Sequence, residues 1–141
     1  MYAYSEAYLR EVVETQGKLF DEIVEYEPDI DVNRFIEDYM MSKTREHIDK
    51  GQVYVATMDA EELWRFFCKT ENYNPVKGEP VRGFMADWIG QFYAYFQWYY
   101  NISSKKVLEL VPLKFIKAAY HGLHDLDLEL AVKKVGGQVA M

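Results

Sequence analysis

Seven of the nine residues from Phe92 to Tyr100 are aromatic, in a chain of 141 residues. This density most constrains the fold, because a small soluble protein cannot leave so much apolar area in water. At helical spacing, one arc of segment 84–100 is apolar and predicts a core-facing helix. The arc holds Met85, Trp88, Phe92, Tyr95, Phe96 and Tyr99, and is widened by Ile89, Tyr93 and Tyr100.

The opposite side of the same helix carries small and polar residues, Gly90, Ala94 and Gln97, where another backbone could approach closely. A strand does not fit the segment, because apolar residues occupy both parities over a length beyond that of ordinary strands. A membrane span does not fit either. The uncharged stretch 88–104 is 17 residues long and rich in Tyr, Gln, Asn and Ser.

The remaining segments predict helices. An amphipathic helix over 3–27 ends at Pro28, a second runs from a cap at Asp29 or Asp31 to Gly51, and Asp59 with Glu62 forms a capping box for a third. Residues 52–57 are predicted to be a loop. After the aromatic helix, predicted helices begin at Ser103 or Ser104, at Pro112 (ending at Gly122) and at Asp125.

These elements predict an all-α fold: a single-domain bundle of about six or seven helices around the central aromatic-rich helix. We expect an acidic helical part over 1–70, a loop over 71–83, the aromatic and C-terminal helices over 84–135, and a frayed tail over 136–141. At 141 residues the chain is long enough for one real core.

The charge is uneven. Residues 1–80 hold 18 acidic and 9 basic residues, whereas residues 81–141 hold 5 and 7. An acidic chain repels phosphate backbones, so general nucleic-acid binding is disfavoured. The single Cys68 allows no internal disulfide, and the N-terminus has no leader-like segment, so a cytoplasmic protein that does not bind membranes is expected. No cofactor motif is present.

A protein-interaction role is favoured by the surplus of aromatic residues. Twelve tyrosines exceed what one domain of this size readily buries, and exposed aromatic patches mark partner surfaces. The candidate anchors are Tyr93, Trp98 and Tyr100. A second candidate surface is the acidic face of the first helix, which carries Glu11, Glu14, Glu22 and Glu25 and could mask a basic partner. The partner would be another protein or a second copy of this chain.

Two other functions remain open. Residues 103–120 could form a helix-turn-helix that binds DNA through Lys105, Lys106, Lys114 and Lys117, although the second helix lacks Arg, Asn and Gln for base edges, and Phe115, Ile116 and Tyr120 look like core. Residues 121–127 could instead bind a metal in a hydrolase through His121, His124, Asp125 and Asp127, although Gly122 should break the helix between the histidines.

No catalytic residue is predicted, because neither Cys68 nor any histidine stands in a recognisable nucleophile motif.

The C-terminal half contains Trp88-Ile89-Gly90, the aromatic run, Ile102-Ser103-Ser104-Lys105 and Tyr120-His121-Gly122-Leu123-His124-Asp125. Over about residues 81–135 it resembles an uncharacterised family of small helical bacterial proteins, some of them encoded beside suspected toxins. The resemblance implies an antitoxin-like role and supplies no catalytic residues.

Overall fold

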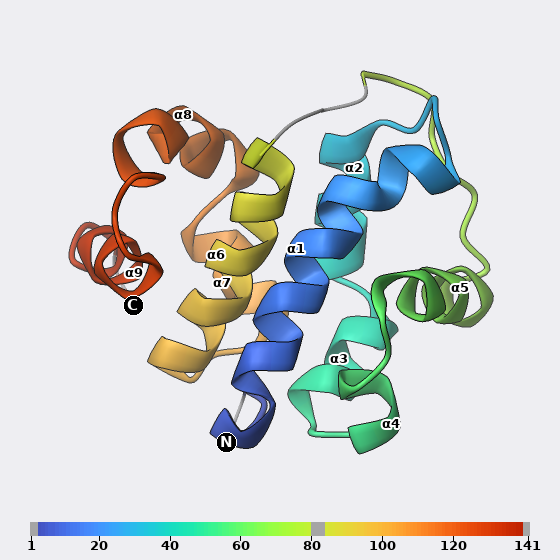
Figure 1. The fold of residues 1–141 in the computed structure, drawn as a ribbon, viewed down its shortest axis with the longest axis horizontal. Coiled ribbons are helices and arrows are strands. Elements are labelled where there is room, and N and C mark those ends of the chain that lie inside the picture. Colours follow the sequence, from blue (N-terminus) through green and yellow to red (C-terminus); the bar gives the residue numbers. More distant parts are fainter. Residues whose placement is uncertain (1–2, 80–83, 140–141) are drawn as a thin grey trace.

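Two long helices, α1 (Leu9–Tyr26) and α6 (Phe84–Tyr100), pack against each other at the centre of the structure (Figure 1). The structure is a computed structural model that describes residues 3–79 and 84–139. Around the central pair lie α2 (Val32–Met40), α3 (Lys43–Asp49), α4 (Val53–Ala56), α5 (Ala60–Glu71), α7 (Ser104–Leu110), α8 (Leu113–Leu123) and α9 (Leu128–Gly136), and the 3-10 turn η1 (Glu6–Tyr8) precedes α1.

Helices α2 to α5 lie on the α1 side of the central pair, and α8 and α9 lie on the α6 side (Figure 1). Within the described residues, β pairing is limited to one isolated bridge between Ile30 and Lys77. The predicted all-α bundle around an aromatic-rich central helix is therefore confirmed. In the same part of the chain, no helix is both long enough and apolar enough to cross a bilayer.

Two glycines allow the central helices to approach closely. A Cβ atom on Gly90 would lie 2.6 Å from the Gln16 carbonyl oxygen, and a Cβ atom on Gly17 would overlap Asp87 Oδ1. Gln16 Nε2 also donates to the Gly90 carbonyl at 2.7 Å. Gly90, Ala94 and Gln97 are consequently buried, and the small, polar side of α6 receives another backbone as expected.

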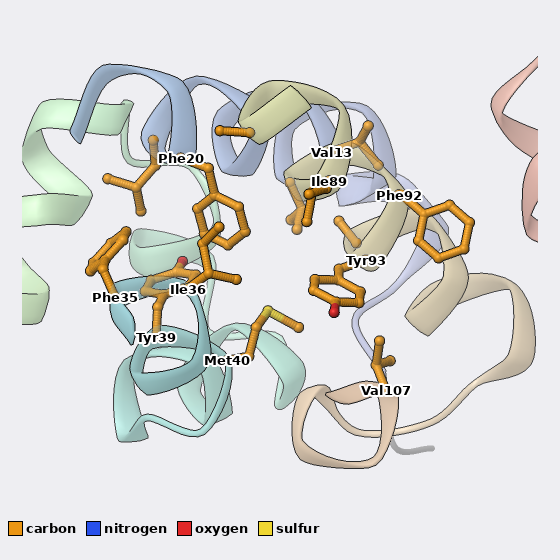
Figure 2. Packing of buried hydrophobic residues seen from close by; sticks show 14 of the residues in the cluster. Val13, Phe20, Phe35, Ile36, Tyr39, Met40, Ile89, Phe92, Tyr93 and Val107 are labelled. Atoms are coloured by element: carbon orange, nitrogen blue, oxygen red, sulfur yellow. The ribbon is translucent and has the colours of Figure 1, made fainter. Parts of the chain in front are cut away.

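One part of the core lies between α1, α2 and α6. Figure 2 shows Phe20 of α1 among Phe35, Ile36, Tyr39 and Met40 of α2, with Tyr93 of α6 on the other side and Val107 of α7 beyond it. Phe20 meets Phe35 and Tyr39 edge to face, at centroid distances of 6.0 and 5.7 Å. Such ring pairs add to the stabilisation that burial of their area provides.

Arg45 of α3 is buried completely, and its guanidinium ties three helices together. Its Nε donates to Gln16 Oε1 of α1 at 2.7 Å, and its Nη2 donates to Gln97 Oε1 of α6 at 2.6 Å. Its Nη1 pairs with Asp49 Oδ1 at 2.8 Å, and Gln97 Nε2 donates to the same oxygen at 2.6 Å. The Tyr4 ring centroid lies 5.8 Å from the guanidinium carbon. A buried charge persists only when it is paired and hydrogen-bonded in this way.

Several element boundaries differ from the sequence prediction. The predicted second helix is two helices, because Ser42 ends α2 and caps α3, accepting from Arg45 N–H at 3.1 Å. The predicted loop at 52–57 contains the single turn α4. Asp31 caps α2 and Asp59 with Glu62 forms the capping box of α5, as predicted.

The C-terminal boundaries also differ. Gly122 does not end α8, which continues to Leu123, and Asp127 rather than Asp125 precedes α9. Gly136, assigned to the frayed tail, is the buried last residue of α9. Residues 80–83 of the predicted loop and 140–141 of the predicted tail lie outside the described residues.

Substitution of Gly90 by Ala should destabilise the protein by about 2–3 kcal/mol, because the new methyl group meets the α1 backbone. Gly122→Ala is the matched control. It lies on the exposed side of α8 with no atom near its Cβ position, and it should stabilise by about 0.5–1 kcal/mol through helix propensity. Urea unfolding followed by circular dichroism measures both. Equal effects of the two substitutions would contradict the close approach of α1 and α6.

Removing the Asp49 carboxylate should lower the free energy of unfolding far more than removing an exposed carboxylate of a similar ion pair. Asp49→Ala leaves the Arg45 guanidinium buried without its counter-ion, and the free energy of unfolding should fall by about 3–5 kcal/mol. Glu61→Ala breaks an exposed ion pair with Arg65 at the same i, i+4 spacing and should cost less than about 1 kcal/mol. Similar losses in the two variants, measured by urea unfolding, would refute this account of the core.

Candidate functional site

The three aromatic anchors suggested by the sequence occupy different environments. Tyr93 is wholly buried, and its hydroxyl donates to the Val111 carbonyl at 2.8 Å, so it does not contribute to a surface. Trp98 is half-buried beside Tyr95, at a centroid distance of 5.6 Å. Tyr100 is half-buried because Gly136 of α9 leaves room for its ring. The buried side of α6 is therefore turned from the predicted arc toward Gly90, Ala94 and Gln97, and Trp88 and Tyr95 of that arc are only half-buried.

The predicted acidic face of α1 lies at the surface. Glu11, Glu14 and Glu25 are exposed, and Glu22 is half-buried. Glu14 Oε1 pairs with Arg10 at 3.2 Å, and Glu22 Oε2 accepts a hydrogen bond from the Tyr26 hydroxyl at 2.9 Å. The C-terminal half of α1 therefore carries the denser group of carboxylates.

Asp87 extends this group from α1 onto α6. Asp21, Glu22, Glu25 and Asp87 together form what we call the acidic ridge. Partial burial raises the pKa of Asp21, and the neighbouring charges of Asp87, Glu22 and Glu25 raise it further. Asp87 reaches this position because Gly17 has no side chain that would exclude it. The carboxylates of the ridge repel one another, and a cation bound beside them would reduce that repulsion.

Next to the ridge, an open pocket of about 360 Å³ lies between α6 and the C-terminal end of α8. We call it the aromatic pocket, and it is lined by Phe84, Asp87, Trp88, Gln91, Tyr120 and His124. Trp88 meets the Tyr120 ring edge to face at 5.5 Å, and Tyr120 stacks on His124 at 4.6 Å. Phe84 is 83% exposed, the highest value among the large apolar side chains described.

Asp87 is the carboxylate of this pocket. Its Oδ1 accepts a hydrogen bond from Gln91 Nε2 at 2.7 Å, which fixes the carboxylate against the α6 surface. His124 lies at the opposite wall, with its Nδ1 3.0 Å from the Tyr120 carbonyl oxygen and its Nε2 3.3 Å from Asp125 Oδ1. The pocket thus combines aromatic walls with a fixed carboxylate that also belongs to the acidic ridge.

The lysines of the suggested DNA-binding region are dispersed among acidic and polar partners. Lys105 pairs with Glu46 at 2.7 Å, and this contact lowers the pKa of Glu46. Lys106 lies 3.8 Å from Glu109, and Lys117 donates to Asn33 at 3.0 Å. The fourth, Lys114, shares a shallow pocket with Glu37. Carboxylates thus pair with two of the four lysines, Lys105 and Lys106, and reduce the local positive charge that a phosphate backbone would need.

The second helix of that region is less buried than its sequence suggests. Ile116 is wholly buried and Tyr120 is half-buried, but Phe115 is 39% exposed rather than part of the core. Phe115 instead borders an open apolar pocket of about 390 Å³ between α8 and α9.

The suggested metal ligands do not form a coordinating group. Within residues 3–79 and 84–139, no three His, Cys, Asp or Glu side chains are placed to hold a metal ion. His124 is engaged with Tyr120 and with Asp125, while Asp127 precedes α9 without a side-chain capping bond. The structure therefore does not bring His121, His124, Asp125 and Asp127 together as a coordinating group.

Cys68 is half-buried against the core, and burial together with the charge of Glu27 raises the pKa of its thiol to about 11. A thiol with this pKa is almost entirely protonated near neutral pH and is a poor nucleophile.

The sequence analysis missed that Asp87 lies close to the carboxylates of the first helix. The available signal was that Asp87 is the only charged residue of segment 84–100 and stands one turn from Gly90.

Comparison of the chain with protein-family models, with curated proteins and with solved structures finds no match.

Neutralising Asp21 should stabilise the protein at neutral pH. The pKa of Asp21 is raised in the folded state, so above that pKa its ionisation lowers the free energy of unfolding. At low pH, where Asp21 is protonated in both the folded and the unfolded protein, this loss disappears. Asp21→Asn should therefore raise the free energy of unfolding at pH 7, by less than about 1 kcal/mol because the site is partly solvated. The advantage should vanish near pH 3.

Asp125→Asn is the matched control at an exposed aspartate and should change stability by less than about 0.5 kcal/mol at pH 7. Thermal unfolding of both variants across the pH range gives the comparison. An advantage of Asp21→Asn that persists unchanged at pH 3 would show that charge is not its cause.

Proposed function

We propose that this protein is a non-catalytic, antitoxin-like interaction module that acts in the cytoplasm and masks a basic protein partner with its acidic N-terminal helices. The observation that carries the proposal is the acidic ridge, where partial burial and the nearby charges of Asp87, Glu22 and Glu25 raise the pKa of Asp21. Such a cluster is costly to the isolated protein. A partner that brings positive charge to it recovers that cost on binding.

The surroundings of the ridge support the same reading. Glu11 and Glu14 continue the negative charge along α1, which favours rapid, salt-sensitive association with a cationic surface. Tyr99 and Phe84 expose aromatic area at the two ends of α6 and can serve as anchors. A second copy of the chain is a poorer occupant of this surface than a basic protein, because two ridges would oppose like charges.

The test is capture of the basic partner from the native lysate with two matched baits. The ridge variant carries Asp21→Asn, Glu22→Gln and Glu25→Gln. The control variant removes the same amount of charge elsewhere, at three exposed carboxylates that form surface ion pairs: Glu61→Gln, Glu109→Gln and Glu129→Gln. The wild type and the control variant should retain one basic protein in stoichiometric amount. The ridge variant should retain at least tenfold less of that protein.

Light scattering during size exclusion then gives the mass of the recovered complex relative to the 16.7 kDa chain. Co-expression of the recovered partner tests the antitoxin-like part: growth inhibition by the partner should be relieved by the wild type and not by the ridge variant. Recovery of an acidic partner, equal loss in both variants, or no stoichiometric partner at all would overturn the proposal.

A further inference from the structure

The aromatic pocket has the composition of a site for an organic cation. Its lining includes the rings of Phe84, Trp88, Tyr120 and His124, together with the side chains of Asp87 and Gln91. Aromatic rings attract cations through their quadrupole, and Trp is the strongest of them. A carboxylate beside the rings selects a charged guest over a neutral one of equal size.

Cation–aromatic contacts already exist elsewhere in the molecule, where the protein itself supplies the cation. The Arg45 guanidinium lies 5.8 Å from the Tyr4 ring centroid, and Lys133 Nζ lies 5.8 Å from that of Tyr99. The aromatic pocket differs in this respect. Its lining residues, all within the described part of the chain, include no lysine and no arginine.

The orientation of Trp88 is set by its ring neighbours. It is stacked on Phe92 at a centroid distance of 5.2 Å and meets Tyr120 edge to face at 5.5 Å. A guanidinium group is planar, stacks on aromatic faces, and pairs with a carboxylate through two parallel N–H groups. Arginine therefore matches the rings and Asp87 together better than lysine does.

We propose that the aromatic pocket receives an arginine side chain of the basic partner, with the guanidinium stacked against Trp88 and paired with Asp87. This inference rests on the proposed function and makes it more specific, because Asp87 belongs to both the acidic ridge and the pocket. The ridge provides long-range attraction of positive charge. The pocket provides the contact that distinguishes arginine from other basic residues.

The experiment is a titration with N-acetyl-arginine-amide, followed through the indole N–H signals in two-dimensional NMR spectra. Three tryptophans, Trp64, Trp88 and Trp98, give three such signals, and Trp88→Phe assigns the one that matters. The Trp88 signal should shift saturably, with a dissociation constant on the order of 1–10 mM as expected for an isolated side chain. N-acetyl-citrulline-amide, which is neutral and of nearly the same shape, should give no saturable shift.

Two variants distinguish binding in the aromatic pocket from general electrostatic attraction. Asp87→Asn keeps the oxygen that accepts from Gln91 and removes the charge, and it should weaken arginine-amide binding about tenfold. Trp98→Phe alters the aromatic cluster at the other end of α6, where Lys133 already lies near Tyr99, and should leave binding unchanged. Melting curves confirm that both variants are folded.

The inference is overturned if the Trp88 signal does not shift, if citrulline amide shifts it equally, or if Asp87→Asn binds as the wild type does. Failure here is distinguishable from failure of the proposed function. A protein that captures its basic partner through the ridge but shows no shift at Trp88 keeps the function and loses the pocket. A protein that binds arginine amide but recovers no basic partner keeps the pocket and loses the function.

Discussion

The buried charge of Arg45 is the constraint on which the rest of the structure depends. Its guanidinium is satisfied by groups from three different helices, Gln16 of α1, Asp49 of α3 and Gln97 of α6. Asp49 Oδ2 in turn accepts from the Ser104 N–H at the start of α7. Because each group would be costly if left alone, the four helices are held in one relative arrangement. Arg45, Gln16 and Gln97 are buried and the Asp49 side chain is 8% exposed, which fits a structural role for the network.

That arrangement produces the surface proposed to be functional. Gln16 is positioned by Arg45 and also donates to the Gly90 carbonyl, which fixes the level at which α1 meets α6. Gly17 follows, and the space above it is occupied by Asp87. A carboxylate of α6 is thereby brought beside Asp21 of α1. The acidic ridge is thus a consequence of helix packing, and a local rearrangement of side chains could not readily disperse it.

The sequence predicted the helices well where their period and caps were strong. The central helix at 84–100 and the caps at Asp31 and Asp59 follow from local chemistry, and the structure has them. The break at Ser42 was missed because neither glycine nor proline marks it, and the next such residue after Pro28 is Gly51. The candidate site could not be predicted. Its residues come from α1, α6 and α8, and only tertiary packing decides that Asp87 meets Asp21 while Tyr93 is buried.

The aromatic side chains of α6 lie in three different environments along the helix. In the middle of the helix, Phe92 and Phe96 are wholly buried. At the C-terminal end, Tyr99 remains partly exposed but has Lys133 near its ring. At the N-terminal end, the rings around Trp88 border Asp87, and the described residues that line that pocket include no lysine or arginine. The N-terminal end is therefore where an external cation has most to gain, and the arginine proposal follows from that asymmetry.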